Sequence, residues 1–205
     1  MGLLNKLEGV RTLHNRYFAL RHGKSQANEL GIIVSHPENG ENGYGLVDEG
    51  RVQVYESVKK ALEGGVLGQH VVVASSPFKR ARETGLIAQA LIKTPHFRIE
   101  NALRERHFGT LEKTGNQNYA MVNGLDAENA DHTEHGVESV HAVLERTTGL
   151  ILDLEEEYSG QSFLLASHGD TLQILQTGFE KIPGAHHRKL AHLNNGEIRQ
   201  LHLKL

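Results

Sequence analysis

Three short apolar runs, each closed by a turn of polar, glycine or proline residues, constrain the fold of this 205-residue chain most strongly. They cover 17–20 (YFAL), 71–74 (VVVA) and 163–166 (FLLA). Runs of this length, rich in β-branched or aromatic residues, are typical of strands that are buried on both faces. We therefore expect three central strands, with polar residues gathered at their ends.

Segments with helical periodicity separate these runs. After Asp48, apolar residues recur at three- or four-residue spacing. They are Val52, Tyr55, Val58 and Leu62. Other helices are expected at 78–91, with Pro77 in the first turn, at 140–158 and at 172–179, and further strands at 97–100 and 198–203. Strands that alternate with helices predict an α/β fold, a three-layer α/β/α arrangement with a mostly parallel central sheet.

Composition limits the class of protein. An apolar content of 38% and a charged content of 23% fit one soluble globular domain, expected over 1–205. No apolar stretch could cross a bilayer, and the first fifteen residues do not resemble a signal peptide, so we expect a cytoplasmic protein. A net charge of −3 gives no general attraction to nucleic acid or membrane. The oligomeric state stays open.

Residues suited to binding phosphate follow these predicted strands. Arg21 and His22 come after the first strand, Arg80 after the second, and His168 after the third. In open α/β sheets ligands bind at the carboxyl ends of the strands, so these side chains are expected to converge there. The chain has no cysteine, which excludes a thiolate nucleophile. Glu105, in the charged segment 103–109, is a candidate proton donor, although an ion pair with a neighbouring arginine is the alternative.

The residues around these positions resemble the motifs of a known family. The segment 21–28 (RHGKSQAN) resembles the RHGxSxxN signature of the histidine phosphatase superfamily, the phosphoglycerate mutase-like proteins. The segments 75–84 (SSPFKRARET), 103–109 (LRERHFG) and 167–169 (SHG) resemble three further motifs of that family, in the same order. The resemblance extends over 16–203 and implies the phosphoglycerate mutase-like fold.

The resemblance also implies a role for each matching residue. His22 would be the nucleophile that forms a phosphohistidine, and Glu105 would protonate the leaving alkoxide. The residues implied to bind the phosphoryl group are Arg21, Arg80, His168, Asn28, Ser25 and Gly169. This chemistry requires no metal or cofactor, and its partner is a small phosphate ester. For Ser25, capping the following helix is an equally good interpretation.

Within the family, the sequence favours a phosphatase over a mutase. The segment that follows the glutamate motif has no arginine between Arg106 and Arg146, so the carboxylate of a phosphoglycerate would lack guanidinium partners there. We therefore expect a metal-independent phosphatase that hydrolyses a phosphate monoester. Phosphoglycerate mutase-type phosphoryl transfer and a non-catalytic phosphate-binding module are the alternatives, and the natural substrate stays open.

Several other residues are weaker candidates for roles at the site. Arg82 is the alternative to Arg80, but positions two apart on a helix face different ways. Ser35 and His36, in the loop 31–45, are placed to reach the substrate if that loop is mobile. His132 with His135, or His186 with His187, would suit a metal, but neither pair has the spacing of a known zinc motif.

Overall fold

The computed structural model describes residues 4–205, so the first three residues of the expected domain lie outside the described chain. Its five strands form one sheet in the order β3-β2-β4-β1-β5. The strands are β1 (Arg16–Arg21), β2 (Val71–Ser75), β3 (Phe97–Ile99), β4 (Ser162–Ser167) and β5 (Ile198–Leu201). The first four run parallel, and β5 pairs antiparallel with β1. The predicted mostly parallel α/β sheet is confirmed.

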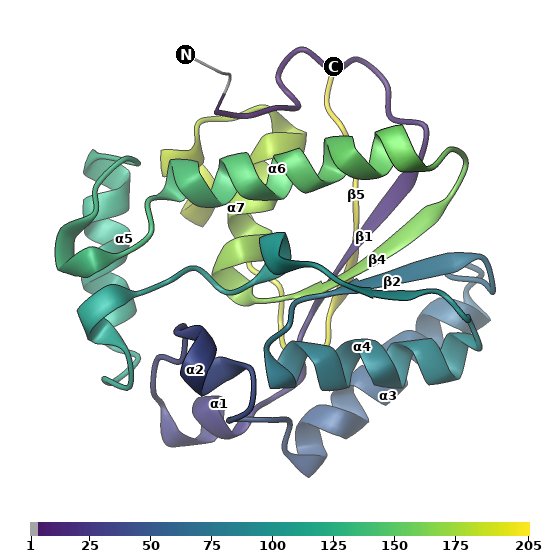
Figure 1. Ribbon diagram of the computed structural model, residues 1–205, viewed down its shortest axis with the longest axis horizontal. Coiled ribbons are helices and arrows are strands. Elements are labelled where there is room, and N and C mark those ends of the chain that lie inside the picture. Colours follow the sequence, from purple (N-terminus) through teal and green to yellow (C-terminus); the bar gives the residue numbers. More distant parts are fainter. Residues whose placement is uncertain (1–3) are drawn as a thin grey trace.

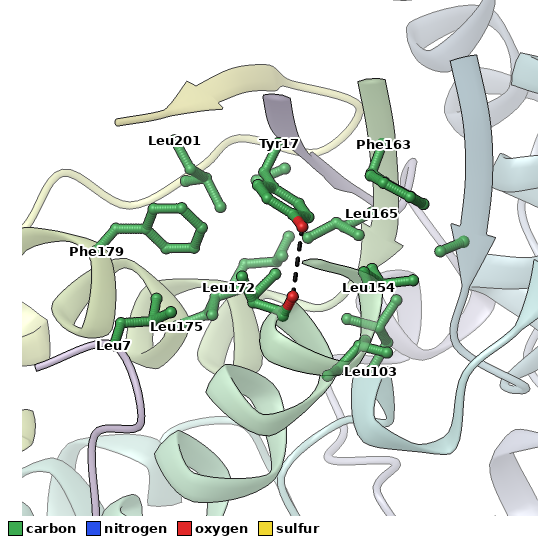
Figure 2. Close-up of a cluster of buried hydrophobic side chains, with 14 of the residues drawn as sticks. Leu7, Tyr17, Leu103, Leu154, Phe163, Leu165, Leu172, Leu175, Phe179 and Leu201 are labelled. Atoms are coloured by element: carbon green, nitrogen blue, oxygen red, sulfur yellow. Dashed lines mark hydrogen bonds between the residues drawn. The ribbon is translucent and has the colours of Figure 1, made fainter. Parts of the chain in front are cut away.

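Helices cover both faces of the sheet (Figure 1). One face carries α6 (Val140–Glu157) and α7 (Gly169–Glu180), and the other carries α3 (Asp48–Glu63) and α4 (Lys79–Ile92). Successive side chains of a strand point to opposite faces, so Tyr17 packs toward α6 and α7 while Phe18 packs toward α3 and α4. In Figure 2 the Tyr17 hydroxyl reaches the backbone of α6, at 3.4 Å from the Ile151 carbonyl oxygen.

The strand register brings the polar turns together. Arg21 of β1 lies opposite Ser167 of β4, and Ser75 of β2 lies opposite Ala166. The ladder continues one residue further, because the His22 amide donates to the Ser167 carbonyl at 2.9 Å. Three strand ends therefore stop at the same level of the sheet, as the position of their polar residues predicted.

The helix α3 is rotated from the predicted orientation, although Val58 is buried and Leu62 packs against the core as predicted. Its buried positions are Gly50, Val54, Val58 and Ala61. Val52 and Tyr55, predicted to face the core, are 59% and 45% exposed. A methyl group on Gly50 would lie 2.0 Å from the Lys24 carbonyl oxygen, so this glycine lies directly against the turn after β1. The packed face of the helix therefore includes Gly50, and Val52 and Tyr55 lie outside it.

Two other predictions need correction. The helix α4 starts at Lys79 with Phe78 as its N-cap, so Pro77 precedes the helix instead of lying in its first turn. The segment 113–136, in which no helix or strand was predicted, contains α5 (Asn118–Glu128), which lies at the left edge of Figure 1, apart from the sheet. The remaining short elements are α1 (Gln26–Leu30), α2 (Pro37–Gly40) and the 3₁₀ turns η1 (Asn101–Leu103), η2 (Gly109–Leu111), η3 (Glu134–Gly136) and η4 (Gly184–Lys189).

The loop 31–45 is held in place by hydrogen bonds to the chain after η2. Segments 31–34 and 113–116 form a short antiparallel ladder, in which the Ile33 amide donates to Thr114 at 2.9 Å and the Lys113 amide donates to Ile33 at 2.8 Å. Glu112 accepts hydrogen bonds from the Ser35 amide and hydroxyl at 2.7 and 2.8 Å, and from the Asn39 amide group at 2.9 Å. Over residues 4–205, none of the helices has the length and apolar character needed to span a membrane.

Candidate active site

A cavity of about 300 Å³ opens at the carboxyl edge of the sheet. Seven of the eight predicted site residues line it. They are Arg21, His22, Ser25, Asn28, Arg80, Glu105 and Gly169. The eighth, His168, lies next to this group but does not line the cavity. Chain topology thus brings together residues as far apart in the sequence as Arg21 and Gly169.

His22 is buried, and its tautomer is fixed by its two hydrogen bonds. Its Nδ1 atom lies 2.8 Å from the Gly23 carbonyl oxygen, and a carbonyl only accepts, so Nδ1 carries the proton. Nε2 accepts a hydrogen bond from Arg80 Nε at 3.1 Å and therefore holds a lone pair. Burial, followed by the charges of Arg80 and Arg21, lowers the pKa of His22 well below its usual value. The ring is therefore neutral, with a lone pair on Nε2.

Arg80 is the first guanidinium of the cavity. Besides its bond to His22, its Nη2 donates to the Val34 carbonyl at 2.9 Å, which ties it to the loop 31–45. Its Nη1 atom is buried without a hydrogen-bond partner among the described residues. A buried guanidinium with free N–H groups is suited to bind the oxygens of a phosphoryl group. Arg82, the alternative, points elsewhere, and its closest polar contact is the Glu41 carbonyl oxygen at 3.4 Å.

Arg21 is the second guanidinium of the cavity. Its Nη1 donates to the Leu193 carbonyl at 2.7 Å and to His192 Nε2 at 2.9 Å. Its Nε is buried and has no partner in the described part of the chain. Burial and the charges of Arg21 and Arg188 lower the pKa of His192 to about 4, so His192 accepts from Arg21 as a neutral ring. The arginine is held in place with one N–H group still free.

His168 lies beside His22, with ring centroids 5.2 Å apart, and its edge packs on Phe78 at 5.3 Å. Its Nε2 is 2.9 Å from the Ser76 hydroxyl, whereas its buried Nδ1 has no partner within residues 4–205. Burial, Arg80 and His22 lower the pKa of His168 well below its usual value. Contact between His168 and a phosphoryl oxygen stays a prediction.

Glu105 is buried and forms hydrogen bonds only with uncharged groups. Its Oε1 accepts from the Arg106 backbone amide at 2.9 Å and from the Thr171 hydroxyl at 3.2 Å. The Arg106 side chain instead pairs with Asp126, through two hydrogen bonds of 2.7 Å. Burial, followed by the charge of Asp170, raises the pKa of Glu105. Glu105 is therefore suited to carry a transferable proton.

Ser25 and Asn28 form a capping box at the start of α1. Asn28 Oδ1 accepts from the Ser25 amide at 3.0 Å, and Ser25 Oγ accepts from the Asn28 amide at 3.3 Å. Ser25 thus caps the helix and also lines the cavity. Because the Asn28 carbonyl oxygen faces Ser25, its amide nitrogen is the group left to donate to a ligand.

Sequence reasoning missed the outer wall of the cavity. It is lined by Asn116, Tyr119, Asn123, Asp170, Arg188 and His192. Asp170 directly follows the motif 167–169 at a predicted strand end, whereas neither strand ends nor periodicity carry a signal for the other five. Arg188 also corrects an inference from sequence, because it brings a guanidinium to the cavity from outside 106–146. That guanidinium already pairs with Asp170, and it donates to Asn123 at 2.9 Å and to Gln173 at 2.8 Å.

The other residues that we considered lie outside the cavity. Ser35 is 1% exposed and bonds to Glu112, and its hydroxyl accepts from the Phe108 amide at 2.9 Å. Neither Ser35 nor His36 lines the cavity, so the prediction that they reach the substrate is not supported. His132 Nε2 lies 2.7 Å from Asp126, the carboxylate that Arg106 already occupies.

The chain is similar to known proteins over most of its length. The model of the histidine phosphatase superfamily (branch 1) matches residues 17–204. A metal-independent phosphoserine phosphatase from Arabidopsis thaliana is 24% identical over 191 residues, which cover 90% of this chain and 75% of that protein.

Solved structures share the fold of this chain. A mycobacterial glucosyl-3-phosphoglycerate phosphatase matches with a TM-score of 0.73 and 22% identity, over 90% of this chain and 88% of that one. A phosphoserine phosphatase mutant from Entamoeba histolytica, in complex with phosphoserine, matches with a TM-score of 0.72 and 21% identity, over 91% and 89% of the two chains. At this level of identity, the likeness shows a shared fold.

Proposed function

Because the chain belongs to the histidine phosphatase superfamily, we propose that it is a phosphatase that hydrolyses phosphate monoesters through a phosphohistidine at His22. The observation that carries the proposal is the lone pair on His22 Nε2, held in a cavity whose two arginines have unpartnered buried N–H groups. A neutral imidazole beside preorganised cations is what in-line attack on a phosphorus atom requires.

The first half of the reaction uses the groups already described. The Nε2 lone pair of His22 forms a bond to phosphorus as the bond from phosphorus to the alcohol oxygen breaks. The Glu105 carboxyl group gives its proton to that oxygen, so the product leaves as a neutral alcohol. Arg80 and Arg21 bind the equatorial oxygens, where the charge of the transition state is concentrated.

The second half restores the enzyme. Glu105, now a carboxylate, takes a proton from a water molecule as its oxygen attacks the phosphohistidine. The bond from phosphorus to Nε2 breaks, the electron pair returns to His22, and inorganic phosphate is released. Each group ends in its starting protonation state, and no step requires a metal.

The outer wall supports a small polar alcohol as the leaving group. Asn116, Asn123 and the Tyr119 hydroxyl offer hydrogen bonds, and the volume of about 300 Å³ leaves room beyond the phosphoryl group for a few polar groups. The relatives described above are named for phosphoserine and glucosyl-3-phosphoglycerate, both esters of polar alcohols. The substrates in these names are polar, as the residues of the outer wall are.

The test is hydrolysis of an aryl phosphate and of a panel of alkyl phosphates, with a chelator present. We expect activity in the wild type, none in His22→Ala, and nearly full activity in the matched control His36→Ala. Brief mixing with radiolabelled substrate followed by base quench should trap label on the wild type, in acid-labile, base-stable form, as phosphohistidine requires. Absence of turnover by the wild type would favour a phosphate-binding module, and transfer to phosphoglycerate without hydrolysis would favour a mutase.

A further inference from the structure

Two buried carboxylates share the cavity. Glu105 comes from the chain between η1 and η2, and Asp170 is the second residue of α7. They are 9% and 5% exposed, and both line the cavity. Neighbouring residues tie them together: Thr171, beside Asp170, donates its hydroxyl to Glu105 at 3.2 Å, and the Arg106 side chain, beside Glu105, reaches Asp170 at 3.4 Å. Two such groups cannot both be ionised without cost.

The cations near this pair are divided unequally. Asp170 forms ion pairs with Arg188 and Arg106, one through each carboxylate oxygen. The hydrogen bonds of Glu105 come from a backbone amide and a hydroxyl, and no described arginine or lysine lies within ion-pair distance of it. An ionised carboxylate is stabilised much more by guanidinium groups than by neutral donors. The negative charge of the pair is therefore favoured on Asp170.

Other groups around the pair do not reverse this preference. Arg80, Arg21 and the Tyr119 hydroxyl face Glu105 from the other walls, and His187 faces Asp170 from η4. Burial would raise the pKa of Asp170, but Arg188 and Arg106 outweigh burial and lower it. The pKa of Glu105 is raised by burial and by Asp170, more than Arg80 lowers it.

We propose that Asp170 is a positioning residue that keeps the transferable proton on Glu105, because its two arginine partners fix it as the ionised member of the pair. This inference rests on the proposed function, in which Glu105 donates that proton to the leaving group. Asp170 exchanges no proton during the reaction. Its charge decides which carboxyl group holds the proton before the phosphate ester binds.

The test is the pH profile of kcat/KM for an alkyl phosphate in Asp170→Asn. Glu105 acts in its protonated form, so the rate falls as pH rises through the pKa of Glu105. Removal of the neighbouring negative charge lowers that pKa. The alkaline limb should then move to lower pH by about one unit or more, the size expected for a nearby like charge. An aryl phosphate, which needs less protonation, should show a smaller loss at neutral pH.

Two further variants separate this effect from structural damage. Asp153→Asn removes one negative charge from the exposed side of α6, where solvent screens it, and should leave the limb in place. Arg188→Gln leaves the charge of Asp170 less neutralised and should move the limb to higher pH, the opposite direction. Damage to the fold would not move the limb in both directions. If Asp170→Asn does not fold, Arg188→Gln provides the test, because Arg188 is partly exposed and its replacement should disturb the fold less.

Titration of the Glu105 carboxyl carbon by ¹³C NMR gives a readout that does not depend on turnover. A lower Glu105 pKa in folded Asp170→Asn supports the proposal. An unchanged pKa and an unchanged alkaline limb, with the wild type active, would overturn it while leaving the phosphatase function intact. Loss of the proposed function itself would appear separately, as a wild type without His22-dependent hydrolysis.

Discussion

Arg80 donates a hydrogen bond from Nε to Nε2 of His22, 3.1 Å away, and so occupies the lone pair that would attack phosphorus. A phosphoryl oxygen that binds the Arg80 N–H groups would take over this hydrogen bond and release the lone pair. On the proposed mechanism, Arg80 would hold His22 in the attacking tautomer and free its lone pair when an anion binds. In the absence of an anion, the same bond keeps the imidazole from turning away.

Replacement of Arg80 by lysine tests this relationship. Lysine keeps the positive charge but has no planar fork of N–H groups, so it cannot hold the Val34 carbonyl and meet phosphoryl oxygens bidentately as arginine can. We expect kcat to fall by about 10²- to 10³-fold, the usual cost of removing one preorganised donor from a charged transition state. The matched control is Arg82→Lys on the same helix, which should stay near wild-type activity in steady-state assays. Equal losses in the two variants would contradict the role of Arg80.

Glu105→Gln should separate substrates by their leaving groups. The amide cannot donate a proton, so hydrolysis of alkyl phosphates should fall by about 10²- to 10⁴-fold. Aryl phosphates leave as stabilised phenolates, and their first step should change much less. The measurement is the burst of alcohol release for both classes, with Glu134→Gln on the exposed turn η3 as the control. The same loss for both classes would remove Glu105 from the role of acid.

Acid should destabilise the native protein through its buried histidines. His22, His168 and His187 have lowered pKa values in the folded state, so below about pH 6.5 the unfolded chain binds protons that the native state does not. Stability is complete above that pH and falls as pH drops, by up to about 1.4 kcal/mol per pH unit for each ring. Urea unfolding at pH 7.5 and 5.5 measures the loss.

A pair of variants checks the origin of this pH dependence. His187→Asn should reduce the loss of stability between the two pH values, because one buried ring no longer takes up a proton on unfolding. His70→Gln, at an exposed position, should leave the loss unchanged. If both variants behave like the wild type, the pH dependence has another source.

Glycine at position 23 is expected to be essential for the packing of the turn after β1. A methyl group there would lie 2.2 Å from the Gly50 carbonyl oxygen, which belongs to the backbone of α3 and cannot move aside alone. Gly23→Ala should lower the free energy of unfolding by about 1–3 kcal/mol, in the range of overpacked sites. Gly124→Ala, with open space around it inside α5, should instead raise stability by about 0.5–1 kcal/mol. Chemical denaturation distinguishes the two signs.

The sequence predicted the parts of the molecule that local patterns determine. Strands β1, β2 and β4 follow from apolar runs, and the phosphate-binding groups follow from the residues after them. By contrast, α5 buries only Val122 and Asp126, so its apolar periodicity is weak. Asp126 is buried because Arg106 and His132 pair with it, and Arg106 lies 20 residues earlier in the sequence, too far for a local pattern to reveal. A helix held by a distant ion pair leaves no hydrophobic pattern to find.

The outer wall escaped prediction for a related reason. Arg188 and His192 lie in a turn and a loop near the C-terminus, where their sequence context is that of an ordinary solvated segment. Their neighbours in space, Asp170 and Gln173, belong to α7 and complete a hydrogen-bonded group that exists only in the folded chain. The orientation of α3 was only partly predicted, because the face that packs includes Gly50, whose close backbone contact with the turn after β1 leaves no apolar signal in the sequence.

The ladder between segments 31–34 and 113–116 has a consequence for protein engineering. It joins the segment whose Val34 carbonyl binds Arg80 to the segment that begins the outer wall of the cavity. These two segments are therefore coupled in the folded structure. A transplant of 113–136 from a relative, made to change substrate preference, would break this pairing unless 31–34 came with it. Exchange of both pieces together would leave the reaction chemistry in the recipient sheet and bring the donor's selectivity as a unit.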